Sequence, residues 1–192
     1  MDDKQMLHDT LRSARDDLVG KLDGLGEYDV RRPMTPTGTS LLGLVKHVAG
    51  VTYGYFSASF GRDPGIALPV TYDDDDPEAD LWVLATEPRA QILEMYTVAN
   101  RVADETIAAL DLDSPGQVPW WAPDKRDVTL GRVMAHLIAE IARHAGHADI
   151  LRELIDGQAG RWPGDPSIGH WTPEEWATHR ADVERAAHEA AR

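Results

Sequence analysis

Apolar residues recur at steps of three and four along four long stretches of the chain. This is the spacing of one face of an α-helix, and it predicts four amphipathic helices. In the first stretch the repeating residues are Leu7, Leu11, Ala14, Leu18 and Leu22. The four stretches cover about residues 3–25, about 40–60, 86 to at least 106, and about 127–155.

Capping residues mark the ends of these helices and the start of a fifth. Thr39 or Ser40 can cap the second helix, and Gly157 ends the fourth. The segment "WTPEEW", residues 171–176, has a threonine N-cap, a proline in the first turn and a glutamate that closes a capping box. Its two tryptophans occupy the positions of a hydrophobic staple, so a C-terminal helix is predicted after residue 172.

The segments between the helices show no sustained alternation of apolar and polar positions, so no strand is predicted. Two of them are long, residues 61–82 and residues 111–127. The acidic run Asp73–Asp76 is expected to be solvated loop, because it lacks the glycine turn and terminal glutamate of a calcium-binding loop. The pattern therefore predicts an all-α fold, a four-helix bundle with long crossover loops and an additional C-terminal helix.

Length and composition fit one domain with a sizeable core. The chain has 192 residues, of which 42% are hydrophobic and 27% charged. We expect a single helical domain over residues 1–192, with the bundle at about 3–155 and a C-terminal extension at 156–192.

Charge and cysteine content narrow the possible partners and chemistry. The formal net charge is −14 and no basic run offsets it, which argues against nucleic acid and against an anionic membrane surface. The chain has no cysteine, so any metal must be held by nitrogen and oxygen ligands. The start of the chain does not have the pattern of a signal peptide, and no stretch approaches the roughly 20 apolar residues of a membrane span. We therefore expect a cytoplasmic protein.

Polar groups that can bind a metal follow one face of the fourth helix. His136, Glu140, His144 and His147 all fall on the face that also carries apolar residues, which is the face turned toward the core. A carboxylate and imidazoles on such a face cost several kcal/mol unless they are paired or bound to a metal. One ion cannot reach all four, because the first and last histidines are roughly 16 Å apart along the axis.

An ion can be held by adjacent residues of this face and one residue of a facing helix. Glu140 and His144 lie one turn apart, and His47 lies in the middle of the apolar stripe of the second helix. Two histidines and one carboxylate leave coordination positions open, as in catalytic rather than structural zinc sites. Zinc is the first expectation for the divalent metal, and the same ligands suit nickel, iron or manganese.

Other assignments remain open on this pattern. His47 and His144 can instead be core histidines that hydrogen-bond to each other or to Glu140. His147 is a competing ligand, since it lies three residues from His144, whereas His136 is expected beside the site or at its rim.

The remaining histidines and several other side chains receive weaker interpretations. Trp120 and Trp121 either wall a pocket at the end of the bundle or simply cover the core. Arg143 and Arg152 are expected to be surface ion-pair partners, with the alternative of holding an anionic substrate. The histidines that lie in polar surroundings and receive no role are His8, His170, His179 and His188.

Two segments resemble the motifs of the DinB-like superfamily of metal-binding four-helix proteins. The first is "LLGLVKHVAGVTYGYF", which contains His47, and the second is "EIARHAGH", residues 140–147. The superfamily includes the metal domain of mycothiol-dependent maleylpyruvate isomerase and the bacillithiol transferases. The likeness spans roughly residues 3–155, and it carries the ligands of the family onto His47, Glu140 and His144.

This sequence departs from the common motif at two positions. Glu140 stands where a histidine is more usual, although the maleylpyruvate isomerase branch resembles this chain in using glutamate. His147 replaces the glutamine of the family, which leaves the surroundings of the ligands different from the pattern.

The resemblance implies a metal-dependent enzyme that acts on a low-molecular-weight thiol such as mycothiol. A divalent metal lowers the pKa of the thiol and presents a thiolate to an electrophilic substrate, as in S-transferases and isomerases. A chain without cysteine then obtains its nucleophile from the cofactor. No residue stands out as a general base, and metal-bound hydroxide could serve instead.

Two alternatives to this function remain from the sequence. The same ion could activate water in a metal-dependent hydrolase. The chain could also be a non-catalytic, stress-related bundle that binds a metal or ligand. The expected partners are small molecules, and the chain is expected to be a monomer or a homodimer.

Overall fold

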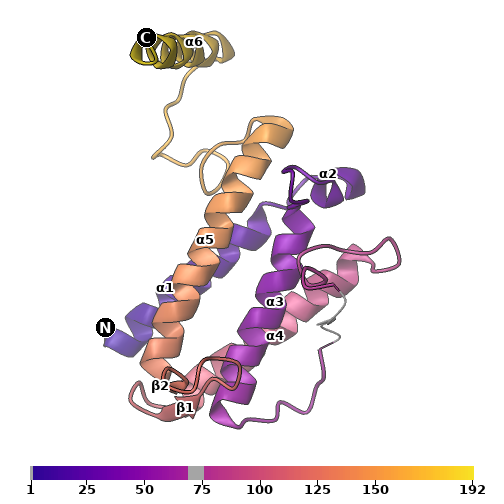
Figure 1. Cartoon of the computed structure of the whole chain (residues 1–192), viewed down its shortest axis with the longest axis vertical. Helices are drawn as coiled ribbons and strands as arrows, with labels where there is room; N and C mark the ends of the chain where they lie inside the picture. Colours follow the sequence, from indigo (N-terminus) through magenta and orange to yellow (C-terminus); the bar gives the residue numbers. More distant parts are fainter. Residues whose placement is uncertain (1, 69–75) are drawn as a thin grey trace.

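Four long helices carry the fold in the computed structural model of the chain, which describes residues 2–68 and 76–192 (Figure 1). They are α1 (Asp3–Gly20), α3 (Leu41–Ser57), α4 (Arg89–Ala109) and α5 (Leu130–Asp156). The other elements are the short helix α2 (Glu27–Arg31), the 3-10 turn η1 (Ala58–Phe60) and the C-terminal helix α6 (Pro173–Ala190), which lies outside the bundle. The predicted all-α bundle is confirmed.

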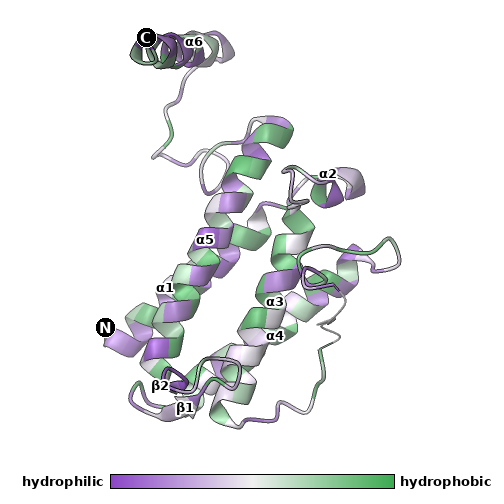
Figure 2. Ribbon diagram, in the orientation of Figure 1, coloured by the Kyte–Doolittle hydropathy of each residue, from purple (hydrophilic) through white to green (hydrophobic). Residues whose placement is uncertain are grey.

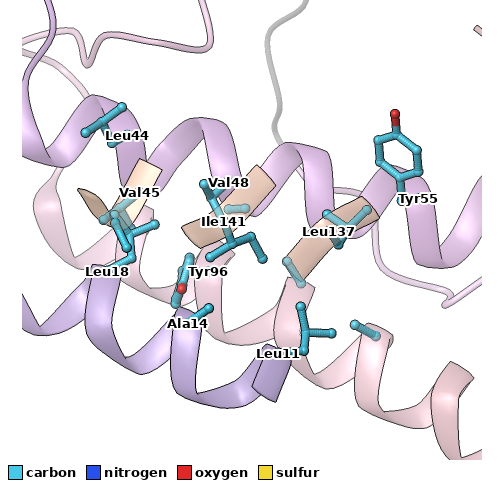
Figure 3. Close-up of a cluster of buried hydrophobic side chains, with 14 of the residues drawn as sticks. Leu11, Ala14, Leu18, Leu44, Val45, Val48, Tyr55, Tyr96, Leu137 and Ile141 are labelled. Carbon is cyan, nitrogen blue, oxygen red and sulfur yellow. The ribbon is translucent and has the colours of Figure 1, made fainter. Parts of the chain in front are cut away.

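Helix α3 is buried over most of its length because it packs against both α4 and α5, while α1 packs against α5. Figure 2 shows α3 mostly in hydrophobic or neutral colours. Side chains from all four long helices meet in one core, and Figure 3 shows Leu18, Val48, Tyr96 and Ile141 among them. Full burial of one such aliphatic side chain is worth about 1.5–3 kcal/mol, so these stripes determine which helices pair.

The ends of the helices follow the capping residues. Ser40 Oγ accepts a hydrogen bond from the amide of Gly43 at 3.3 Å and caps α3. Thr129 Oγ1 accepts from the amide of Arg132 at 3.3 Å and caps α5. Gly157 adopts φ +80° and ends α5, as the sequence predicts.

Helix α4 begins at Arg89, three residues later than residue 86, where the predicted third helical stretch begins. The reason lies in the glutamate between them, because Glu87 Oε2 accepts from the amide of Leu84 at 2.7 Å. Its other oxygen, Oε1, lies 2.9 Å from the Nζ of Lys46 on α3. Residue 87 therefore belongs to the connection that crosses α3 and not to the first turn of the helix.

The prediction of no strands is wrong for one short hairpin. Strand β1 (Pro115–Gln117) pairs antiparallel with β2 (Asp127–Thr129) in the connection before α5. Each strand has three residues, which is too short to produce a visible alternation. Gly116 fits under Phe60, where a Cβ would come 2.6 Å from the ring. The hairpin holds the loop that carries Trp120 and Trp121 against the end of α3.

Helix α1 ends at Gly20, earlier than the predicted residue 25, because the next carbonyls bond elsewhere. Arg152 Nη1 donates to the carbonyls of Lys21 and Asp23, both at 2.9 Å. The expectation of a surface position for Arg152 is therefore wrong, since its side chain is only 6% exposed. It does form an ion pair, with Asp156 at 2.7 Å.

The C-terminal helix α6 has no buried residue and lies beyond the end of α5 in Figure 1. Its predicted capping box is present at Thr172 and Glu175, and the ring centroids of Trp171 and Trp176 are 4.7 Å apart. No helix in the described part of the chain is long and apolar enough to span a membrane. The division into a bundle at about 3–155 and an extension stays a prediction.

The acidic connection between η1 and α4 is described only in part. Asp73–Asp75, most of the predicted solvated run, lie outside the described residues. Asp76 Oδ2 accepts a hydrogen bond from Trp82 Nε1 at 3.0 Å. The last residue of the run therefore belongs to the turn that crosses α3.

Candidate metal centre

Three side chains from two helices converge beside the core. His47 comes from the middle of α3, and Glu140 and His144 come from adjacent turns of α5; we call them the His–Glu–His group. One ligand atom from each lies within 4.8 Å of the other two. Glu140 Oε1 is 3.1 Å from His144 Nε2 and 3.7 Å from His47 Nε2. The structure thus brings together the three residues that the sequence singles out, and their role as ligands stays a prediction.

Packing between α3 and α5 places the His–Glu–His group. His47 is followed by the fully buried Val48, and Ile141, also fully buried, directly follows Glu140. These apolar side chains hold the two helix faces together, so the polar side chains beside them are held at the edge of the core. The rings of His47 and His144 meet edge-on, with centroids 4.8 Å apart.

The electrostatics of the group favour the protonation states that bind metals. Burial raises the pKa of Glu140, but the hydrogen bond and charge of His144, together with His47, outweigh it and hold the pKa below its usual value. Burial lowers the pKa of His144, the charge of His47 lowers it further, and Glu140 opposes both effects. An ionised carboxylate and a neutral imidazole result, which are the forms that coordinate metal ions.

A carboxylate that the sequence analysis missed orients His47. Asp80 Oδ2 lies 2.7 Å from His47 Nδ1, and the two atoms form a hydrogen bond. A carboxylate only accepts, so Nδ1 carries the hydrogen of this bond, and Nε2 is the ring nitrogen that lies toward Glu140. Carboxylate–histidine pairs of this kind orient metal-binding imidazoles in known sites. No local spacing in the sequence marks Asp80, because its position depends on the path of the crossing loop.

The buried ammonium of Lys46 holds that loop in place. Its Nζ donates to the carbonyls of Ala79 and Trp82, at 3.1 and 3.0 Å, and pairs with Glu87. The two carbonyls lie on either side of Asp80 in the chain. Lys46 and His47 are adjacent on α3. Lys46 therefore holds the loop backbone, and His47 hydrogen-bonds to the Asp80 carboxylate of the same loop.

The geometry of the group fits a divalent ion. His47 Nε2 and Glu140 Oε1 lie 3.7 Å apart, beyond hydrogen-bond length. Two tetrahedral ligands at about 2.1 Å from zinc lie roughly 3.4 Å apart, which is close to the 3.1 and 3.7 Å seen here. In the described part of the chain, no other three histidine, aspartate or glutamate side chains bring their ligand atoms close enough together to hold a metal ion.

Two further histidines of α5 lie near the group without joining it. His147 is exposed, and its ring centroid is 5.5 Å from that of His144. His136, one turn before Glu140, has its Nε2 3.1 Å from the hydroxyl of Tyr55. Neither belongs to the set of atoms that converge within 4.8 Å.

A cavity of about 670 Å³ opens beside the His–Glu–His group. Its volume is within the usual range for small-molecule sites. Trp120 lines it, whereas Trp121 packs against the core, so each of the two interpretations of these tryptophans holds for one residue. The cavity is also lined by Tyr53, Tyr55, Asp80 and His136. No lysine or arginine is among the described lining residues, so neither Arg143 nor Arg152 lines the cavity.

Of the four histidines without an expected role, three are exposed as expected: His170, His179 and His188. His8 differs, because its Nε2 lies 2.9 Å from Asp104 and its side chain is half-buried. Asp104 also pairs with the buried Arg15 at 2.7 Å. His8 therefore belongs to an ion-pair cluster between α1 and α4, away from the cavity.

Comparison with known proteins agrees with the fold and points to one family. A family model described as "Mycothiol-S-transferase" matches residues 6–157. No curated protein matches the chain. A crystal structure described as "the conserved protein of locus from Enterococcus faecalis" is similar at 20% identity and a TM-score of 0.61. The match covers 82% of this chain and 99% of that one, and at this identity it shows the fold alone.

Proposed function

Because the chain belongs to the mycothiol S-transferase family, within the DinB-like superfamily, we propose that it is a metal-dependent thiol S-transferase. The proposed reaction joins the sulfur of a low-molecular-weight thiol, with mycothiol as the first candidate, to an electrophilic small molecule. The observation that carries the proposal is the convergence of His47, Glu140 and His144, each of which offers one ligand atom within 4.8 Å of the other two.

His47, Glu140 and His144 are the proposed ligands, with zinc as the first expectation and nickel, iron or manganese as alternatives. A divalent ion held by these residues would lower the pKa of a coordinating thiol and so favour the thiolate. One carboxylate and two neutral imidazoles leave the site with one net positive charge, which a thiolate then balances. The chain has no cysteine, so the sulfur has to arrive with the cofactor.

The protein's own groups orient the reactants. Asp80 holds the His47 ring so that Nε2 faces Glu140. The aromatic wall of the cavity, including Tyr53 and Trp120, restricts water and provides apolar surface for the acceptor. The described lining contains no fixed cation, so the acceptor is held by shape and apolar contact rather than by an ion pair.

Metal content tests the ligand assignment directly. We expect purified protein to hold about one ion per chain, and His144→Ala to lose at least about tenfold in affinity, since even outer groups cost that much. His147→Ala is the matched control, because it removes an exposed imidazole three residues away. Unchanged occupancy in His144→Ala together with loss in His147→Ala would contradict the assignment.

Turnover separates the transferase from the alternatives. Metal-loaded protein with mycothiol and an electrophile should form the S-conjugate, and omission of the thiol should abolish the reaction. Consumption of an ester substrate without any thiol would instead indicate a hydrolase. A metal that raises the melting temperature while no substrate class turns over would indicate a non-catalytic bundle.

A further inference from the structure

A second polar cluster borders the same cavity, separate from the His–Glu–His group. Its members are Tyr55 near the end of α3, His136 on α5 and Trp121 in the loop of the hairpin. The Tyr55 hydroxyl is 2.8 Å from Trp121 Nε1 and 3.1 Å from His136 Nε2. In Figure 3 this hydroxyl points away from the buried apolar cluster. Tyr55 and His136 both line the cavity.

The donors and acceptors of this cluster allow the Tyr55 hydroxyl hydrogen two orientations. An indole N–H only donates, so the Tyr55 oxygen accepts from Trp121. The single hydrogen of Tyr55 then points to His136 Nε2 or, when that nitrogen itself carries a hydrogen, into the cavity. Trp121 supports the tyrosine oxygen in either state. The hydroxyl can therefore release a proton toward the cavity and receive one from the imidazole.

The cluster lies at a useful distance from the His–Glu–His group. Tyr55 is eight residues beyond His47 on α3, or about 12 Å along the axis, and His136 is one turn, about 6 Å, before Glu140. The cavity borders both sets of side chains. A small acceptor can therefore lie between a sulfur held near the group and the Tyr55 hydroxyl.

We propose that Tyr55 donates a proton to the acceptor when the thiol adds across an activated carbon–carbon double bond, and that His136 resupplies it. The inference rests on the proposed thiol transfer and names its substrate class, α,β-unsaturated amides and carbonyl compounds. Tyr55 is the catalytic residue, since it touches the acceptor. His136 acts through Tyr55.

The proposed step balances without a further reactant. The thiolate sulfur forms a bond to the β-carbon, and the π electron pair of the double bond moves toward the carbonyl. Tyr55 O–H breaks, its proton goes to the resulting enolate, and its electron pair stays on the phenolate. His136, as the imidazolium, returns a proton to this oxygen through Nε2 and is left neutral, and it regains a proton from solvent, which has taken up the proton released by the thiol. The proton consumed equals the one that the thiol loses.

A pair of acceptors of similar size separates this role from a structural one. Acrylamide reacts by addition and needs a proton, whereas chloroacetamide reacts by displacement, in which the carbon–chlorine bond breaks and chloride leaves. With mycothiol as the thiol, Tyr55→Phe should lower kcat/KM for acrylamide by roughly 100-fold, the usual scale of general acid catalysis. For chloroacetamide the change should stay within about threefold, since no transition-state interaction is lost.

Tyr28→Phe is the matched control, because Tyr28 on α2 is 75% exposed and does not line the cavity. It should leave both reactions within about threefold of the wild type. His136→Ala should lose acrylamide addition selectively, and added imidazole should restore part of it. Metal content and melting temperature of each variant, measured alongside, show whether the fold and the metal site persist.

The results for Tyr55→Phe, His136→Ala and the wild type each support or overturn a specific part of the proposal. An equal loss of both reactions in Tyr55→Phe, or a loss in neither, would overturn the proton-donor role while leaving the proposed transferase intact. Selective loss without imidazole rescue in His136→Ala would overturn the role of His136. Metal-loaded wild-type protein that conjugates neither acceptor would overturn the proposed function, and this inference with it.

Discussion

At the scale of single residues, the positions that helix spacing governs could be predicted and the others could not. Glu140 and His144 are one turn apart on one helix, so the sequence alone places them side by side. The position of His47 beside them can be predicted with one further assumption, that its helix faces the helix of Glu140 and His144. Asp80 comes from a loop whose path depends on Lys46, and no sequence period encodes that contact.

Asp80→Asn tests whether the carboxylate orients His47. The amide keeps the size of the side chain but loses the charge that holds the Nδ1 hydrogen. Metal affinity should fall by about 10- to 100-fold, the usual cost of such a change beside a metal ligand. Competition with a chelating dye measures it, and Glu78→Gln, an exposed residue of the same loop, is the control. Wild-type affinity in Asp80→Asn would remove Asp80 from the account.

Lys46 should influence the metal only through Asp80. Lys46→Met removes the ammonium that holds the carbonyls of Ala79 and Trp82 and should weaken metal binding. In the Asp80→Asn background the same change should add little, because coupled residues are not additive. The four affinities of this double-mutant cycle measure the coupling. Fully additive losses would show that Lys46 acts by another route.

At the scale of elements, the long helices could be predicted because many residues repeat one period, whereas short elements carry too few residues. The hairpin has three residues in each strand and was missed. The end of α1 differs from the prediction for another reason, since the carbonyls of Lys21 and Asp23, just beyond it, bond to Arg152 from α5. That contact is tertiary, and the local sequence does not contain it.

The pair formed by Arg152 and Asp156 gives a prediction for pH. The hydrogen bond from Arg152 lowers the pKa of Asp156 below its usual value, so its contribution to stability is present above that value, near pH 3.8. The contribution is lost as the pH falls through the lower pKa of the folded state. Asp156→Asn should therefore lower the melting temperature at neutral pH, and the difference from the wild type should shrink below about pH 4.

Melting curves of the two proteins from pH 7 down to pH 3 check this sign. Glu153→Gln, an exposed residue on the same last turn, is the control and should show no such trend. A difference that grows as the pH falls would contradict the account of this pair.

At the scale of the whole molecule, the bundle could be predicted, but the function depends on what its helices bring together. The His–Glu–His group joins α3 to α5, and the cavity adds the loops on both sides of α4. The sequence indicated the group, and it left the loops that complete the cavity without an assigned fold. Tyr55 and His136 had no partner in the sequence pattern, because their contact spans 81 residues.

Metal that links α3 and α5 should stabilise the whole bundle. An ion that binds only the folded state at 100 times its Kd adds about 2.7 kcal/mol to the free energy of unfolding. Removal of the ion with a chelator should lower the melting temperature of the wild type and lower that of His144→Ala by less. Equal responses of the two proteins would indicate that the ion binds elsewhere.

The central claim is that one divalent ion lies among His47, Glu140 and His144. An anomalous difference map from crystals of zinc-loaded protein, measured at the zinc edge, tests it most directly. The account predicts one strong peak about 2.0–2.2 Å from His47 Nε2, His144 Nε2 and a carboxylate oxygen of Glu140. A stoichiometric peak at any other place, or none at these three side chains in metal-loaded crystals, would contradict it.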